Sequence, residues 1–91
     1  MKLFSWSPAK NEKLKQDRGV SFEQVVFSIE SGRLLDVLEH PNPDKYEGQR
    51  LYVVEIENYA YIVPFVDREN ERFLKTIFPS RRYTKIYLRK G

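Results

Sequence analysis

Apolar residues recur at helical spacing near the start of the chain. Positions i, i+3, i+4 and i+7 of one stretch are apolar and share one helix face: Phe22, Val25, Val26 and Ile29. Ser21 and Gln24 have the spacing of a capping box, in which each side chain bonds the other residue's backbone N–H. We predict a helix that begins after Ser21, ends near Ser31 and Gly32, and packs this face against a core.

An earlier helix is predicted from about Pro8 to Arg18. Ser7 is a favourable N-cap, and Pro8 suits the first helical position because its missing N–H would be unpaired there anyway. Gly19 can end the helix in the left-handed conformation. The apolar face of this helix is thin, so we expect a surface helix whose lysines point to solvent.

Strand patterns follow Arg33. The expected strands are residues 34–39, 50–57, 59–66 and 72–78. Glu57 and Asn58 form a plausible tight turn, which would join the second and third strands as an antiparallel hairpin. Pro79 should stop the last strand, because proline cannot donate to a sheet ladder. Residues 1–91 are therefore predicted to form one α+β domain, with helices on one side of an antiparallel sheet of about four strands and a short C-terminal helix.

Charge is unevenly distributed along the chain. Residues 1–71 carry nine Lys and Arg against thirteen Asp and Glu, a net of −4, whereas residues 72–91 carry seven Lys and Arg and no acid, a net of +7. A cationic cluster of this kind attracts nucleic acid or an acidic protein through the same Coulomb attraction, so charge alone leaves both partners open.

Residue counts and hydropathy narrow the class of protein. The chain has no cysteine and a single histidine, which gives no disulfide and no expected metal site. The uncharged stretch from Tyr59 to Val66 is far too short to cross a bilayer, and the first residues lack the apolar core of a signal peptide. We expect a soluble cytoplasmic protein without membrane contact, metal or other cofactor.

The polar residues favour one metal-free reaction. The sequence has no G-x-S-x-G motif and no glycine-rich phosphate loop, which argues against common hydrolases and nucleotide-binding proteins. RNA, however, can be cut by its own 2′-hydroxyl attacking the adjacent phosphate. A protein then needs only a proton acceptor, cations for the transition state and a proton donor for the leaving oxygen.

Three arginines are candidates for the catalytic cations. Arg50 begins a strand, and Arg81 and Arg82 follow the end of a later strand. If these strand ends meet at one edge of the sheet, three guanidinium groups would surround one phosphate. His40 is the candidate for proton transfer, because imidazole exchanges protons near neutral pH. The alternatives are an exposed strand-end arginine, a solvated cationic face and a polar loop histidine.

The C-terminal segment, residues 80–90, predicts an amphipathic helix. Its cationic face contains residues at i, i+4 and i+8: Arg81, Lys85 and Arg89. Its docking face is expected to contain Tyr83, Ile86 and Tyr87. The candidate RNA contacts are Lys10, Lys13, Tyr83, Lys85 and Arg89. The alternatives are ordinary surface lysines and tyrosines at the edge of the core.

Three segments carry a family resemblance: "FSWSPAKNEKLKQDRGVSFEQVVFSI", "EGQRLYVVEIE" and "FLKTIFPSRRYTKIYL". In order and spacing they resemble the BrnT-like toxins of bacterial type II toxin–antitoxin modules, a branch of the RelE/ParE superfamily. Arg50 matches the arginine at the family's strand start, and Arg81 and Arg82 match the basic pair after its last strand. The chain departs from the family pattern at Asp17 with Arg18, where Lys-His is common, and at Tyr83, where a small residue is common.

The resemblance implies a RelE-like fold and a metal-independent endoribonuclease that restrains growth. It also implies a hetero-oligomer with a small cognate antitoxin, which in this family often carries a ribbon-helix-helix DNA-binding domain. A non-catalytic module of the same fold, which binds RNA or protein without cutting it, is the second hypothesis, because the superfamily includes proteins with other targets.

Overall fold

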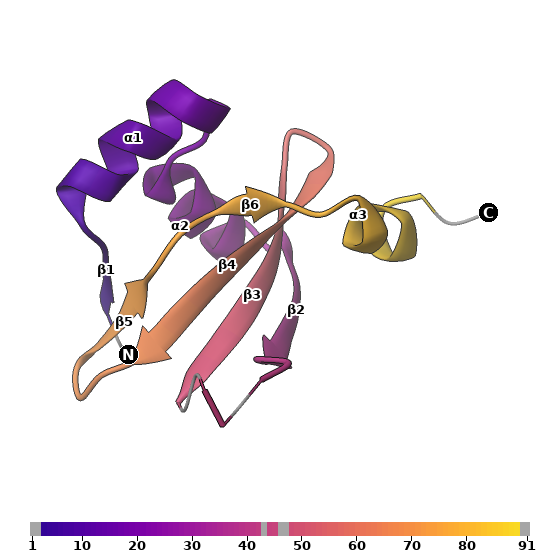
Figure 1. Cartoon of the computed structure of the whole chain (residues 1–91). Coiled ribbons are helices and arrows are strands. Elements are labelled where there is room, and N and C mark those ends of the chain that lie inside the picture. Colours follow the sequence, from indigo (N-terminus) through magenta and orange to yellow (C-terminus); the bar gives the residue numbers. More distant parts are fainter. Residues whose placement is uncertain (1–2, 43, 46–47, 90–91) are drawn as a thin grey trace.

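The computed structural model describes residues 3–42, 44–45 and 48–89. The helices are α1 (Pro8–Arg18), α2 (Phe22–Glu30) and α3 (Arg81–Tyr87). The strands are β1 (Leu3–Ser5), β2 (Leu34–Glu39), β3 (Gln49–Ile56), β4 (Tyr59–Asp67), β5 (Glu71–Leu74) and β6 (Phe78–Pro79). Figure 1 shows α1 and α3 at opposite ends of the molecule, with the sheet between them.

The predicted caps of the first two helices are confirmed. Ser7 Oγ accepts a hydrogen bond from the Lys10 N–H at 3.2 Å, and Gly19 ends α1 at φ 68°, in the left-handed region. At the start of α2, the Ser21 and Gln24 side chains bond each other's backbone N–H groups at 3.2 and 2.9 Å. Local sequence therefore determines where both helices begin.

The sheet differs from the expected antiparallel one. Within the described residues, six strands form a mixed sheet in the order β1-β5-β4-β3-β2, and β6 pairs with β4. β1, which has only three residues and no alternating pattern, pairs in parallel with β5. The expected strand 72–78 is divided into β5 and β6, both of which pair with the same edge of β4. Pro79, opposite Tyr61, is the last residue of β6, so the strand ends at this proline as predicted.

The hairpin between β3 and β4 is confirmed. Its register runs from Gln49 opposite Val66 to Ile56 opposite Tyr59. Glu57 and Asn58 form the two-residue turn with φ values of 52° and 64°. Positive φ at both central residues is typical of the type I′ turn, whose twist matches that of the flanking strands.

One face of the sheet packs against α1 and α2. Its core contains Leu14, Val20, Phe22, Val25, Tyr52, Val54, Ile56, Val63, Phe65, Leu74 and Ile77. Tyr52 and Phe65 stack at its centre, with ring centroids 3.9 Å apart. Ser28 Oγ of α2 donates to the Glu55 carbonyl of β3 at 2.7 Å, which anchors the helix across the sheet.

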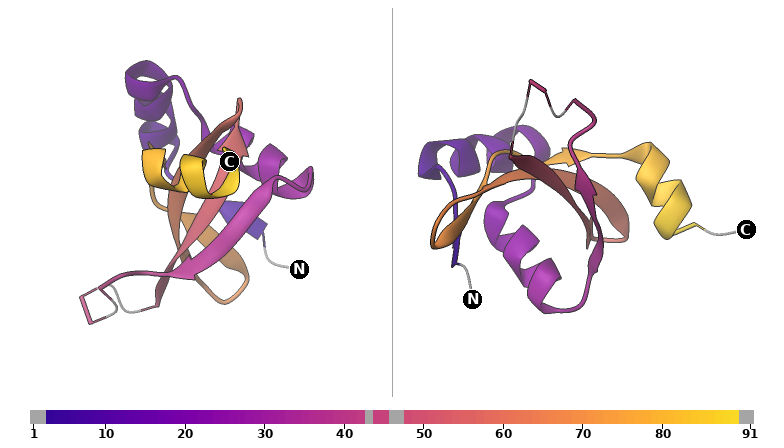
Figure 2. Two further views of the ribbon diagram at one scale, coloured as in Figure 1. Left: turned by 90° about the vertical axis from the view of Figure 1, so that its right-hand side faces the viewer. Right: turned by 90° about the horizontal axis from the view of Figure 1, so that it is seen from below.

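α3 does not share this face. Its Tyr87 hydroxyl donates to the carboxylate of Asp36, which pairs with Val53 on the face opposite Tyr52 and Val54. The prediction that all helices lie on one side is therefore wrong for α3. In the right-hand view of Figure 2, α2 lies against the sheet, and α3 lies at the right-hand end of the molecule. None of the helices in the described part of the chain is both long and apolar enough to cross a membrane.

Candidate nucleic-acid interface

The start of α3 is fixed to the start of β4. Ser80 Oγ caps the helix by accepting from the Tyr83 N–H at 3.1 Å, and the Ser80 N–H donates to the Ala60 carbonyl at 2.9 Å. The buried Thr84 Oγ1 accepts from the Ala60 N–H at 2.9 Å and donates to the Ser80 carbonyl at 2.7 Å. These bonds place the first turn of α3 against the edge of β4 and determine which side of the helix faces solvent.

The cationic side of α3 borders a shallow pocket of about 270 Å³. Its walls are formed by Tyr59, Arg81, Thr84, Lys85 and Arg89. The three basic side chains are exposed and line the same pocket. The predicted helix over residues 80–90 is too long, because α3 ends at Tyr87, so Arg81 and Lys85 lie on the helix and Arg89 follows its end. Within residues 3–42, 44–45 and 48–89, none of the three forms an ion pair with a carboxylate. Their positive charge is therefore available to an anionic ligand.

Tyr59 is the residue of this pocket that sequence reasoning missed. It follows the hairpin turn as the first residue of β4 and is partly exposed. Its ring lies edge to face with that of Tyr61, with centroids 5.9 Å apart and planes at 66°. Burial and then the negative charge of Glu57 raise the pKa of the Tyr61 phenol. Strand alternation alone gave no sign that α3 would lie beside Tyr59, because this depends on the pairing of β6 with β4.

The tyrosines of α3 lie outside the cationic pocket. Tyr83 and Tyr87 contact each other with ring centroids 5.9 Å apart, and the guanidinium of Arg82 lies 5.8 Å from the Tyr83 ring. Both tyrosines are half-buried, as expected for docking residues, but Ile86 is 48% exposed, so the prediction that it docks is wrong. Thr84, Tyr83 and Tyr87 already form the buried side of this short helix.

The predicted convergence of three arginines is also wrong. Arg50 pairs with Phe65 of β4, whereas the Ser80 N–H bonds the carbonyl of Ala60, five residues earlier on the same strand. At about 3.4 Å per residue, the two positions are about 17 Å apart along β4. Arg50 therefore lies near the opposite end of β4 from the start of α3, and it cannot share one phosphate with Arg81 and Arg82.

Arg50 belongs to a separate network. Its Nη2 donates to Asp67 Oδ2 at 2.5 Å, and its guanidinium lies 5.1 Å from the Phe65 ring. Arg72 Nε donates to the other oxygen of Asp67 at 2.9 Å, and its Nη1 donates to the Tyr52 hydroxyl at 2.5 Å. Asp67 thus lies between two arginines, so much of the charge of Arg50 is compensated within the fold.

The remaining candidates lie away from α3. His40 directly follows Glu39, the last residue of β2, which pairs with Arg50. The Nδ1 of His40 accepts a hydrogen bond from the Asn42 N–H at 3.1 Å. Lys10 and Lys13 are exposed on α1, at the other end of the molecule in Figure 1. Lys13 Nζ lies 3.1 Å from the Asp17 carboxylate. Their predicted roles stay predictions, and the structure does not bring them to the cationic pocket.

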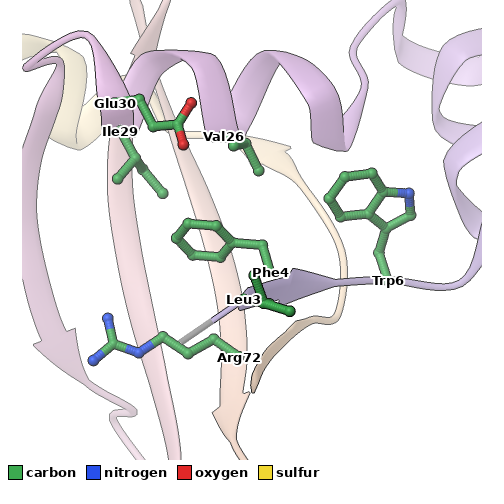
Figure 3. Close-up of a pocket in the computed structure, with 7 residues that line it drawn as sticks. All are labelled: Leu3, Phe4, Trp6, Val26, Ile29, Glu30 and Arg72. Carbon is green, nitrogen blue, oxygen red and sulfur yellow. The ribbon is translucent and has the colours of Figure 1, made fainter. Parts of the chain in front are cut away.

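A larger groove of about 780 Å³ opens between α2 and β1. It is lined by Leu3, Phe4, Trp6, Val26, Ile29, Glu30 and Arg72. Figure 3 shows Phe4 beneath Val26 and Ile29, with Glu30 and Arg72 at its polar borders. Leu3 is 73% exposed beside it. The groove is suited to an apolar group, in contrast to the cationic pocket at α3.

Among the residues that the structure describes, no group of three or more His, Cys, Asp or Glu side chains could hold a metal ion. Comparisons with protein-family models, with curated proteins and with solved structures found no match to this chain. The resemblance to BrnT-like toxins and the RelE-like character of the fold therefore stay predictions from the sequence.

Proposed function

We propose that this chain is a metal-independent endoribonuclease toxin of a type II toxin–antitoxin module and that it binds RNA through the α3 pocket. The observation that carries the proposal is the grouping of Arg81, Lys85 and Arg89 around a pocket that, among residues 3–42, 44–45 and 48–89, has no carboxylate in its lining. Cations arranged in this way attract the phosphate backbone of a nucleic acid. The resemblance to BrnT-like toxins supplies the expectation of cleavage.

The proposed reaction needs little covalent chemistry from the protein. The 2′-oxygen of RNA attacks the adjacent phosphorus, the bond from phosphorus to the 5′-oxygen breaks, and the products are a 2′,3′-cyclic phosphate and a 5′-hydroxyl. One proton leaves the 2′-hydroxyl for an acceptor, and one proton reaches the departing 5′-oxygen. Arg81 and Lys85 would stabilise the negative charge of the pentavalent transition state.

The residues available for proton transfer at this pocket differ from those expected from sequence. The Tyr59 phenol lines the pocket, and the exposed carboxylate of Glu57 lies in the turn immediately before it. Arg50 lies opposite Phe65, about 17 Å from Ala60 along β4, and His40 follows Glu39, the partner of Arg50 on β2. We therefore assign the cationic role to the α3 side chains and leave Arg50 to the Asp67 network.

A cleavage assay tests this proposal. A labelled RNA should be cut in the presence of EDTA and should yield 2′,3′-cyclic phosphate ends, and Arg81→Ala should abolish cutting without changing the melting temperature. Arg68→Ala is the matched control, because Arg68 is an exposed arginine that lies away from α3. Its Nη1 is 3.3 Å from Glu71 Oε1. Loss of activity in both variants alike would contradict the assignment of this pocket.

Binding without cleavage is the second candidate function. The specific observation in its favour is the separation of Arg50 from Arg81, which removes the three-arginine phosphate site from which cleavage was predicted. In this case the wild-type protein would bind RNA with a salt-dependent affinity and leave it intact. An assay that shows binding but no product would favour this candidate.

We also propose a cognate antitoxin as the protein partner, in a hetero-oligomer that neutralises the toxin. Its support is the resemblance to toxin–antitoxin modules and the exposed cationic side of α3, which an acidic segment would cover. Production of the chain alone should then stop growth, and co-production of the antitoxin should restore it. Normal growth with a folded, abundant wild-type chain would contradict the toxin assignment.

A further inference from the structure

The aromatic ring in the cationic pocket suggests which form of RNA the pocket takes. Of the described residues that line it, Tyr59 is the one aromatic residue, and the others are Arg81, Thr84, Lys85 and Arg89. We propose that the Tyr59 ring stacks on an unpaired base while Arg81 and Lys85 contact the neighbouring phosphates, so that the pocket selects single-stranded over duplex RNA. This inference rests on the proposed function and adds its substrate class.

The Tyr59 ring is held in place but retains a face for stacking. It lies at a fixed position of the hairpin, opposite Ile56, and within the described part of the chain its ring has one perpendicular ring neighbour, Tyr61. Tyr61 packs against the hydrophobic core and so provides a rigid support. A ring has two faces, and one perpendicular neighbour occupies at most one of them. The partly exposed Tyr59 ring can therefore receive a base.

The charges around Tyr59 indicate the side on which the phosphates lie. Arg81 and Lys85 are one helical turn apart on α3, a rise of about 6 Å, which is comparable with the distance between consecutive phosphates of a strand. On the turn side, the negative charge of Glu57 contributes to the raised pKa of Tyr61. A phosphate is repelled from the turn and attracted to α3, so the backbone should follow the helix.

Duplex RNA does not satisfy this arrangement. Its bases are paired and stacked, and an aromatic side chain can stack only on a base that has left the helical stack. The tyrosines of α3 offer no equivalent ring, because neither Tyr83 nor Tyr87 is among the described residues that line the pocket. Base stacking at this pocket therefore depends on Tyr59.

The test compares the affinity of the whole chain for one labelled oligonucleotide in single-stranded and in duplex form. Both use 2′-O-methyl ribose, which removes the attacking hydroxyl and prevents cleavage during the measurement. The wild type should prefer the single strand. Tyr59→Ala should weaken single-strand binding by about 5- to 150-fold, with the duplex affinity and the salt dependence unchanged. Tyr59→Phe, which keeps the ring, should bind as the wild type does and serves as the folding-neutral control.

The outcomes separate this inference from the proposed function. If Tyr59→Ala binds the single strand as well as the wild type does, while Arg81→Ala weakens binding, RNA binding at α3 stands and base stacking is overturned. Equal wild-type affinity for both forms overturns the single-strand selectivity in the same way. If the folded wild type binds neither form, both the inference and the proposed function are wrong.

Discussion

Tyr87 of α3 donates a hydrogen bond from its hydroxyl to the carboxylate of Asp36 on β2, 51 residues earlier in the chain. This bond joins the last helix to the face of the sheet that α2 leaves open. It also orients α3, because the side of the helix that carries Tyr83 and Tyr87 must face the sheet when the bond forms. Arg81 and Lys85 then face the pocket beside Tyr59.

Removal of this bond should change the pH dependence of stability. The hydrogen bonds from the Tyr87 hydroxyl and then from the Val37 N–H lower the pKa of Asp36, and the bond to Asp36 raises the pKa of Tyr87. A carboxyl whose pKa is lower in the folded state contributes stability above its unfolded pKa and loses it as pH falls through the folded value. A tyrosine with a raised pKa contributes stability below its unfolded pKa and loses it as pH rises through the folded value.

We therefore expect Tyr87→Phe to unfold at a denaturant concentration that depends less on pH in both the acidic and the strongly alkaline range. Carboxyl titration by NMR should show the pKa of Asp36 moving up towards its ordinary value. An unchanged pKa of Asp36 in Tyr87→Phe would mean that the bond does not form in solution.

Asn11 is a buried polar link between the first two helices. Its Nδ2 donates to Glu23 Oε1 at 2.8 Å, and its Oδ1 accepts from the Phe22 N–H at 2.8 Å. Asn11→Ala leaves this buried N–H without its partner and should lower the free energy of unfolding by about 2–3 kcal/mol in urea titrations. The pKa of Glu23, which the Asn11 amide lowers, should rise. Lys10→Ala, on the exposed side of α1, should change stability by less than about 0.5 kcal/mol.

Glu57 has an unfavourable backbone conformation in the hairpin turn. Its φ of 52° lies in the left-handed region, where asparagine and glycine are favoured at this position of a type I′ turn. Glu57→Asn should raise the free energy of unfolding by about 0.5–1 kcal/mol, with a melting temperature several degrees higher. Loss of the charge should also lower the raised pKa of Tyr61. Glu69→Asn, another exposed acidic position, should show neither effect.

The network of Arg50 and Asp67 should affect stability more than RNA binding. The two side chains are about a third exposed, at 33% and 30%, so solvent screening reduces the value of their ion pair. A double-mutant cycle with Arg50→Ala and Asp67→Ala should give a coupling energy of at most about 1 kcal/mol. RNA affinity of Arg50→Ala should stay within about twofold of the wild type. A variant with full stability and no cleavage would instead restore Arg50 as a catalytic residue.

Short-range features of the fold could be predicted from the sequence. Ser7, Ser21 and Gln24 bond backbone groups within three residues, so their caps depend on local sequence alone. The turn at Glu57 and Asn58 is equally local. The shared side of Arg81 and Lys85 on α3 followed from helical spacing within one segment. Each of these features is determined by residues that are close in the chain.

Features that depend on strand pairing could not be predicted. β1 forms because β5 offers a parallel partner almost seventy residues later, and nothing within Leu3–Ser5 indicates this. The division between β5 and β6, where the Lys75 N–H bonds the Pro64 carbonyl at 2.8 Å, sets the register of Ser80 against Ala60. This register separates Arg50 from Arg81 and brings α3 beside Tyr59. The wrong prediction that the arginines converge and the failure to predict Tyr59 in the pocket therefore have the same origin.

The salt dependence of RNA binding tests the central claim most directly. Affinity for a single-stranded, 2′-O-methylated oligonucleotide is measured over a range of salt concentrations for the wild type, for Arg81→Ala with Lys85→Ala, and for Arg68→Ala. Each lost phosphate contact should reduce the slope of log affinity against log salt by about 0.7. We predict a slope smaller by about 1.4 and weaker binding in the double variant, with Arg68→Ala unchanged. An unchanged slope in a folded double variant would show that α3 does not contact the RNA backbone.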